Sequence, residues 1–196
     1  MGASGCGKST WLRKRLGNKK RRRTFFWSPK EKKDDYASFY PGSVICRTAE
    51  EVRQLLKAAG PRGEFHIVFW PTLVRKVDEL HFDVCCRMLL AVENVAVIVD
   101  ELHTVTRATH ASDGWSQLVM LGRASGVEIY GMSQRPAGVD KNFMGNASLT
   151  RTGRLNFPDD AASVAKSIGV KASDILALVG FQWIERDNLT GKVTLG

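Results

Sequence analysis

The first ten residues, MGASGCGKST (1–10), contain the pattern G-x4-G-K-S between Gly2 and Ser9. A glycine-rich loop with this spacing lets backbone N–H groups surround phosphate oxygens. Within such a loop, Lys8 would reach the β and γ phosphates and the Ser9 hydroxyl would bind Mg²⁺. We therefore expect a nucleotide site, with contacts from Gly2, Ser4, Gly5, Cys6, Gly7, Lys8, Ser9 and Thr10.

A second motif, VAVIVDE (95–101), supports the same interpretation. An apolar strand delivers two acids at its carboxyl end, where Asp100 would hold Mg²⁺ through water and Glu101 would orient and polarise an attacking water. The alternative is a helix N-terminus rich in acids, which the helix dipole favours. Because the loop and the strand occur together, we expect ATP and Mg²⁺ as cofactors and treat Lys8 and Glu101 as catalytic candidates.

The acid pair favours hydrolysis over transfer to a second substrate. A nucleotide kinase must keep water away from the phosphate, so a water-activating Glu101 would work against it. Two alternatives remain open: a small P-loop phosphotransferase, and a nucleic-acid-binding P-loop protein that binds ATP with little turnover.

Length and pattern predict a single α/β domain spanning residues 1–196. The chain has 196 residues and is 43% hydrophobic, enough for one well-buried core. Apolar runs typical of strands alternate with helical periodicity, which predicts a three-layer domain with a mainly parallel central sheet. The expected strands are 24–29, 43–48, 64–70, 94–100 and 126–133, followed by a C-terminal antiparallel hairpin of 181–187 and 191–196.

Cysteine usage and apolar run length exclude two protein classes. The four cysteines show no metal-binding spacing, and adjacent Cys85 and Cys86 in an apolar run indicate core packing. Apolar runs are strand-sized, well short of the ~18 residues of a membrane helix. We expect a soluble, intracellular protein without a membrane span.

Positive charge is concentrated in one segment. Residues 13–33 contain eleven lysines and arginines and one acid, whereas the whole chain carries a net charge of +9. Clustered basic side chains bind phosphate backbones by releasing counterions, without reading sequence. The segment therefore predicts binding to double-stranded DNA, with a solvated basic loop or a nuclear import signal as alternatives.

Downstream of the acid pair, LGRASGVEIYGMSQRP (121–136) places an arginine at a helix end, a glycine before a strand, and Gln134 after that strand. This resembles the FtsK/HerA superfamily of ring-forming ATPases that move DNA. The following segment 146–170 also resembles that family, whose fold is a RecA/FtsK-like three-layer P-loop NTPase. The short length and the SPK-x4-DY element (28–36) are most similar to viral genome-packaging ATPases.

The resemblance implies roles for several residues. Gln134 would sense the γ-phosphate from a strand next to the Asp100 strand, and an arginine of a neighbouring subunit would stabilise the transition state. Arg123 is the first candidate for that arginine, with Arg151 and Arg154 as alternatives. His103 and His110 are interpreted as ordinary loop histidines.

The resemblance also implies partners and a location. A packaging ATPase would work as a homo-oligomer, a hexameric ring when active, on double-stranded DNA and beside a capsid or portal partner. It would act in the host-cell cytoplasm, associate with the virion, or enter the nucleus of a eukaryotic host. In the family's fold a hydrophobic strand leads into the phosphate loop, and only Met1 precedes Gly2 here. We therefore expect that strand to be missing and the loop to be less well supported.

Overall fold

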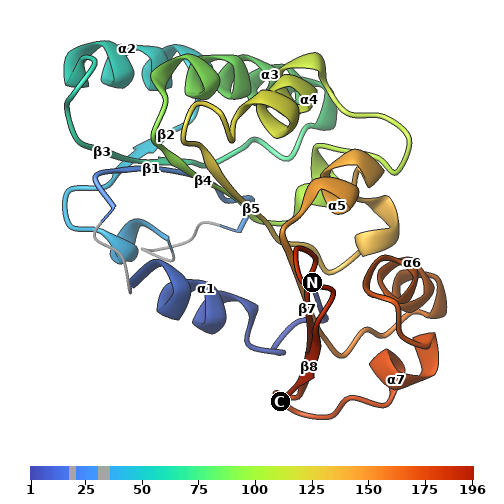
Figure 1. The fold of residues 1–196 in the computed structure, drawn as a ribbon. Helices are drawn as coiled ribbons and strands as arrows, with labels where there is room; N and C mark the ends of the chain where they lie inside the picture. Colours follow the sequence, from blue (N-terminus) through green and yellow to red (C-terminus); the bar gives the residue numbers. More distant parts are fainter. Residues whose placement is uncertain (18–20, 31–35) are drawn as a thin grey trace.

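The computed structural model describes residues 1–17, 21–30 and 36–196. Within these residues, five strands form a parallel sheet in the order β2-β3-β1-β4-β5 (Figure 1). The strands are β1 (Arg23–Trp27), β2 (Val44–Cys46), β3 (Phe65–Phe69), β4 (Ala96–Val99) and β5 (Glu128–Gly131). In register, Thr24 of β1 lies opposite His66 of β3 and Ala96 of β4. The predicted parallel sheet is confirmed.

Helices cover both faces of this sheet. One face carries α1 (Lys8–Gly17), and the other carries α2 (Ala49–Ala59), α3 (Arg75–Val92) and α4 (Asp113–Leu121) (Figure 1). Side chains alternate along β1, so that Phe25 and Trp27 join the α3 side of the core while Phe26 joins the α1 side. Burial of both faces explains why these strands are nearly continuous apolar runs. The three-layer prediction is confirmed.

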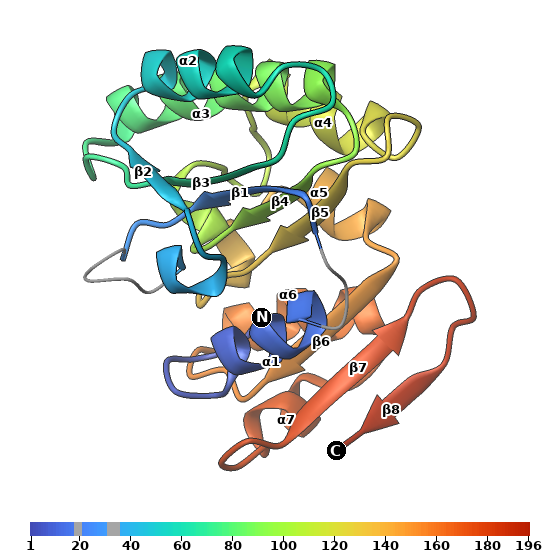
Figure 2. The same ribbon diagram turned by 90° about the vertical axis from the view of Figure 1, so that its left-hand side faces the viewer.

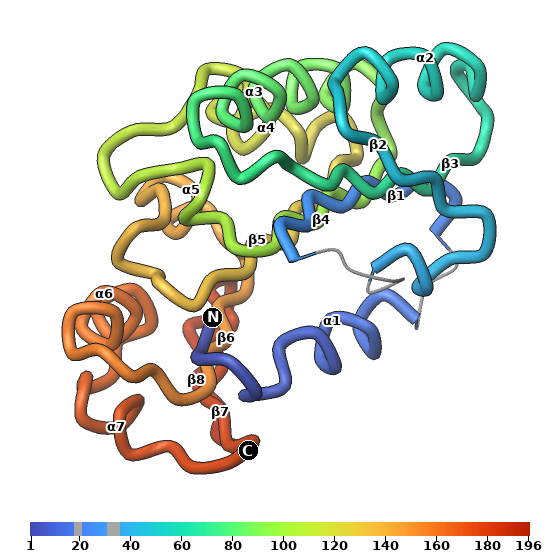
Figure 3. Tube along the Cα trace, turned by 180° about the vertical axis from the view of Figure 1, so that it is seen from behind, coloured from blue at the N-terminus to red at the C-terminus, as the bar shows by residue number. Residues whose placement is uncertain are grey.

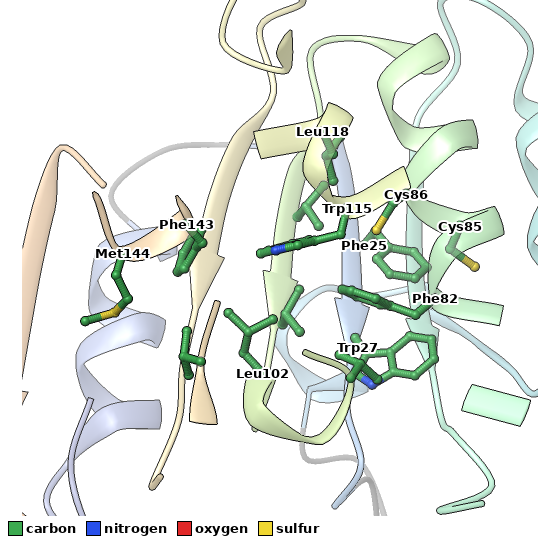
Figure 4. Packing of buried hydrophobic residues seen from close by; sticks show 14 of the residues in the cluster. Phe25, Trp27, Phe82, Cys85, Cys86, Leu102, Trp115, Leu118, Phe143 and Met144 are labelled. Atoms are coloured by element: carbon green, nitrogen blue, oxygen red, sulfur yellow. The ribbon is translucent and has the colours of Figure 1, made fainter. Parts of the chain in front are cut away.

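Aromatic packing dominates the core on the α3 side. The rings of Trp27 and Phe69 stack at 4.5 Å, and Phe82 meets Trp27 edge-on at 5.0 Å. Figure 4 shows Trp27 and Phe82 close together in this core. Cys85 and Cys86 lie in the same cluster and are buried, as the apolar run predicted. This core fixes β1 and β4 side by side, which matters because the residues that follow them form the candidate site.

The last strands of the chain form a second, antiparallel sheet. Among the described residues it contains three strands in the order β6-β7-β8 (Figure 2). Its elements are β6 (Leu149–Gly153), β7 (Trp183–Asp187) and β8 (Val193–Leu195), with α5 (Lys141–Asn146), α6 (Pro158–Ile168) and α7 (Ala172–Leu176) between β5 and β7 along the chain. Short 3-10 turns are η1 (Ala37–Phe39), η2 (Leu102–Thr104) and η3 (Pro136–Gly138). The predicted hairpin is β7–β8, extended by β6 on its other side.

A groove of about 440 Å³ lies between β5 and β6. In the described part of the chain, no strand pairs with β5 on the side facing this groove. At one end, Met1 and Gly2 join the two sheets: the Gly2 N–H donates to the Ser133 carbonyl at 3.2 Å, and the Gly153 N–H donates to the Met1 carbonyl at 3.2 Å. The first residues therefore bridge the strands that flank the groove.

The terminal ammonium group is buried in this bridge. It donates to the Arg151 carbonyl at 2.7 Å. Burial, together with the positive charges of Lys8 and Arg151, lowers its pKa to about 5.

No helix in the described ranges is both long and apolar enough to cross a bilayer.

Candidate nucleotide site

The phosphate loop runs from Gly2 into α1, beside β6 (Figure 3). Gly2, Gly5 and Gly7 all have positive φ angles, of 138°, 77° and 85°. Residues with a Cβ rarely adopt these angles, so the motif's glycines are required by the loop's shape. Because α1 begins at Lys8, its free N–H groups and the positive end of its dipole face the loop. The local geometry is that of an anion-binding helix N-terminus.

Lys8 closes over the loop. Its Nζ donates to the carbonyl oxygens of Gly2 at 2.6 Å and Ala3 at 2.8 Å. The ammonium group is therefore held at the mouth of the loop, where it can exchange a carbonyl for a phosphate oxygen. No carboxylate in the described residues pairs with Lys8, so its positive charge is available to an anion.

Ser9 and Asp100 both lie close to the Tyr36 hydroxyl group. Tyr36 places its phenol beside both side chains, and burial and the Asp100 charge raise the pKa of Tyr36. Burial and the adjacent Glu101 raise the pKa of Asp100. A divalent cation between Ser9 and Asp100 would relieve that repulsion, and hard oxygen donors are what Mg²⁺ prefers. The donor set therefore fits Mg²⁺, with phosphate and water as further ligands.

Glu101 is held at the meeting point of three neighbouring strands. It is 4% exposed and adopts a left-handed backbone conformation, with φ 49° and ψ 50°. Lys30, which follows β1, donates to its carboxylate. From the end of β5, Gln134 donates through its backbone N–H, at 3.1 Å, and through its side-chain amide. A non-glycine residue in this conformation costs free energy, which the surrounding contacts must offset.

These contacts set the protonation state of Glu101. Burial raises the pKa of its carboxyl group, but hydrogen bonds from Lys30 and from the Gln134 backbone outweigh burial and leave the pKa below its ordinary value. Glu101 is therefore a carboxylate at neutral pH. A buried, aligned carboxylate is what a base for water activation requires.

The chain is similar to a phage protein in sequence and to a viral NTPase in structure. No family model matches the chain. Protein P9 of the Pseudoalteromonas phage PM2 is 29% identical over 182 residues, covering 91% of this chain and 77% of P9. The genome packaging NTPase B204 from Sulfolobus turreted icosahedral virus 2 superposes with TM-scores of 0.74 in its sulfate complex and 0.73 in its ATP-gammaS complex. Those alignments are 12% identical and cover 99% of this chain and 92% and 93% of B204.

The chain shares the fold of the viral genome-packaging NTPases. This finding confirms the predicted P-loop NTPase architecture, with its mainly parallel sheet and antiparallel C-terminal strands.

In the packaging-NTPase fold, the structure brings most of the predicted residues together. Gln134 reaches Glu101 because β5 pairs directly with β4. Arg123 lies in the turn that precedes β5, at the opposite edge of the sheet, and is exposed. Arg151 stacks on Trp183 at 3.8 Å and pairs with Glu185 at 3.3 Å. Of the three arginine candidates, Arg151 is thus engaged within its own chain, while the side chain of Arg154 is exposed.

Two site residues differ from the sequence-based interpretation. His103 is not an ordinary loop histidine, because its Nδ1 lies 3.5 Å from the Glu101 carboxylate and 2.9 Å from the Ser133 hydroxyl. Lys30 was predicted to belong to a DNA-binding segment, yet it points to Glu101. The described part of segment 13–33 is therefore divided between the site and other parts of the molecule. Residues 18–20 and 31–33 of this segment, and Asp34 and Asp35 that follow it, lie outside the described residues. Nothing in the sequence pattern indicates this role of Lys30, because it depends on β1 lying next to β4.

Replacing Lys30 with methionine should change the pH dependence of hydrolysis. Removing the cation beside Glu101 raises the pKa of that carboxyl group, so the base form is lost at a higher pH. The acid limb of the rate profile should then move to higher pH, measured without DNA. Lys14→Met, on the exposed side of α1, removes the same charge outside the site and serves as the control. An unmoved acid limb in Lys30→Met would show that Lys30 does not tune Glu101.

Proposed function

We propose that the chain is an ATP-hydrolysing motor that moves double-stranded DNA into a viral capsid. The observation that carries the proposal is the Glu101 carboxylate, buried, ionised and held by Lys30 and Gln134 at the strand ends next to the phosphate loop. The fold shared with B204, a genome packaging NTPase, supports the packaging role. The basic stretch within 13–33 supports DNA as the partner.

Hydrolysis would proceed by in-line attack of water on the γ-phosphorus. The loop N–H groups and Lys8 bind the β and γ phosphates, while Ser9 and Asp100 would hold Mg²⁺, which neutralises phosphate charge when bound. Glu101 orients the water and accepts its proton as the new P–O bond forms and the bond to ADP breaks. Because Gln134 already donates to Glu101, it can sense the γ-phosphate by changing that hydrogen bond.

The remaining charge in the transition state would be stabilised by a second subunit. Arg123 is exposed, and its side chain makes no hydrogen bond or ion pair with the described part of its own chain. Its position away from the nucleotide site in its own subunit suits a group that acts on a neighbour in a ring. We therefore propose a homo-hexamer as the working form, docked on a capsid or portal partner in the host cytoplasm or the virion.

Assembly offers a direct test of this proposal. Native mass measurement of Glu101→Gln protein with ATP, Mg²⁺ and long duplex DNA should give a hexamer on DNA. A protein that stays monomeric under these conditions would contradict the motor. Tight ATP binding with negligible turnover in the unaltered chain would favour the non-motor binding protein, and labelled phosphate on a nucleoside would favour the phosphotransferase.

The strand that leads into the phosphate loop in the family's fold, and that we expect to be missing here, gives a further test, on stability. We expect an apolar, β-branched pentapeptide joined to Met1 to enter the groove, pairing with the open edge of β5 and with β6. It would also replace the buried terminal amino group by a peptide group. A gain of a few kcal/mol would raise the Tm by about 5–10 °C. A Gly-Ser pentapeptide is the control, and an equal Tm for both extensions would contradict strand pairing.

A further inference from the structure

A second cavity, of about 540 Å³, lies at the opposite edge of the sheet from the nucleotide site. It is formed at the amino ends of β1, β4 and β5 and by the turn that precedes β3. Its described lining contains four arginines and a single acid: Arg21, Arg22, Arg23, Arg62 and Glu128. We call this cavity the arginine pocket.

Arg23 forms the floor of the arginine pocket, and no described carboxylate pairs with its positive charge. It is 9% exposed, and its guanidinium donates to the carbonyl oxygens of Gly63 and Val92, both at 3.0 Å, and of Pro61. These acceptors satisfy its hydrogen bonds, but no carboxylate among the described residues neutralises it. The same bonds fix the turn that carries Arg62 against the end of α3.

Arg21 forms one wall of the arginine pocket. Its side chain is 10% exposed and donates to Glu128 at 2.6 Å and to the Tyr130 hydroxyl at 3.1 Å, while its buried Nε has no hydrogen-bond partner. Arg15, in the last turn of α1, lines the neighbouring groove together with Glu128 and Tyr130. The basic surface therefore continues from the pocket to α1.

Two arginines at the rim are available to a ligand. Arg22 is 69% exposed and, among the described residues, forms an ion pair only with Glu64, which is itself 59% exposed, so water weakens that ion pair. Arg62 is exposed and makes no hydrogen bond or ion pair with the described residues. Guanidinium groups bind phosphate oxygens through two parallel hydrogen bonds, and a hollow lined by one sign of charge concentrates the opposite charge.

We infer that the arginine pocket binds phosphates of the double-stranded DNA backbone, with Arg22 and Arg62 as the direct contacts. The inference rests on the proposed function and adds a location to it. The DNA contact lies at the amino edge of the sheet, and the nucleotide lies at the carboxyl edge. The strands β1 and β4 connect the two sites, so that Lys30 and Glu101 stand at one end and Arg23 at the other.

The inference is tested with the double variant Arg22→Gln/Arg62→Gln in the full chain. Its matched control is Arg53→Gln/Arg87→Gln, which removes two exposed arginines from α2 and α3. Affinity for a 30-base-pair duplex is measured across salt concentrations, alongside affinity for inorganic pyrophosphate and the basal ATPase rate. The pocket variant should lose affinity for DNA on the order of tenfold, with the salt slope reduced by about 1.8 for two lost phosphate contacts.

Each outcome of this experiment decides one question. A loss confined to the pocket variant, with basal ATPase unchanged, supports the DNA site. Equal DNA affinity in both variants overturns the inference and leaves the proposed function standing, and a loss for pyrophosphate alone overturns it in favour of a small-anion site. If the unaltered chain binds no duplex, the proposed function itself fails.

Discussion

Replacing Glu101 with glutamine should reduce ATP hydrolysis at least about a hundredfold while leaving ATP affinity nearly unchanged. The amide has nearly the same shape and can still meet Lys30, but it cannot accept a proton from the attacking water. Binding relies on the phosphate loop and Lys8, which this change does not touch. Steady-state hydrolysis and equilibrium ATP binding measure the two effects separately.

Glu185→Gln is the matched control for that experiment, because it makes the same chemical change in the antiparallel sheet. Its pairing partner is Arg151, so the control also reports whether that ion pair matters to catalysis. Retention of rapid hydrolysis in Glu101→Gln would mean that another group activates water. His103, 3.5 Å from Glu101, would then be the first residue to replace.

Replacing Lys8 with alanine should abolish measurable ATP binding at concentrations that saturate the unaltered protein. The change removes the positive charge that meets the β and γ phosphates. Its hydrogen bonds in this structure go to the carbonyls of Gly2 and Ala3, which water can replace, so the Tm should change little. Binding of a fluorescent ATP analogue and thermal unfolding measure these two quantities.

Lys14→Ala, one turn and a half further along α1 and exposed, is the control for charge on the same helix. If Lys8→Ala bound ATP with full affinity, the phosphate loop would not be the nucleotide-binding site. A large fall in Tm would instead indicate that Lys8 supports the fold of the loop, and that the loss of binding is indirect.

Local sequence determined much of the fold. The Thr48 side chain accepts the Glu51 N–H and the Glu51 carboxylate accepts the Thr48 N–H, which is the reciprocal pair of a capping box. Gly169 ends α6 in a left-handed conformation, with φ 71°. Such signals depend on residues a few positions apart, so they can be read before the fold is known.

The phosphate loop and the acid pair were also predictable, because their geometry depends on short, contiguous motifs. Contacts between distant strands were not. Lys30 meets Glu101 because β1 lies next to β4, and no pattern in the sequence states that order. His103 enters the site because the turn after Glu101 folds back onto the end of β5, where the Leu102 N–H donates to the Met132 carbonyl at 2.8 Å.

The basic segment illustrates the limit of charge patterns. A run of lysines and arginines predicts a solvated, polyanion-binding surface. The described members have different environments: Arg23 is buried against carbonyl groups, Lys30 pairs with Glu101, and Arg22 is exposed at the rim of the arginine pocket. Burial and partners, which only the fold provides, decide which of these charges can reach DNA.

The proposed motor couples ATP hydrolysis to movement along double-stranded DNA. The most direct measurement is Mg²⁺-dependent ATP hydrolysis with and without long duplex DNA, at two salt concentrations, beside Glu101→Gln. We predict stimulation by DNA that weakens as salt rises and disappears in the variant. If hydrolysis is absent, or if DNA leaves its rate unchanged at both salt concentrations, the result would contradict the proposed motor.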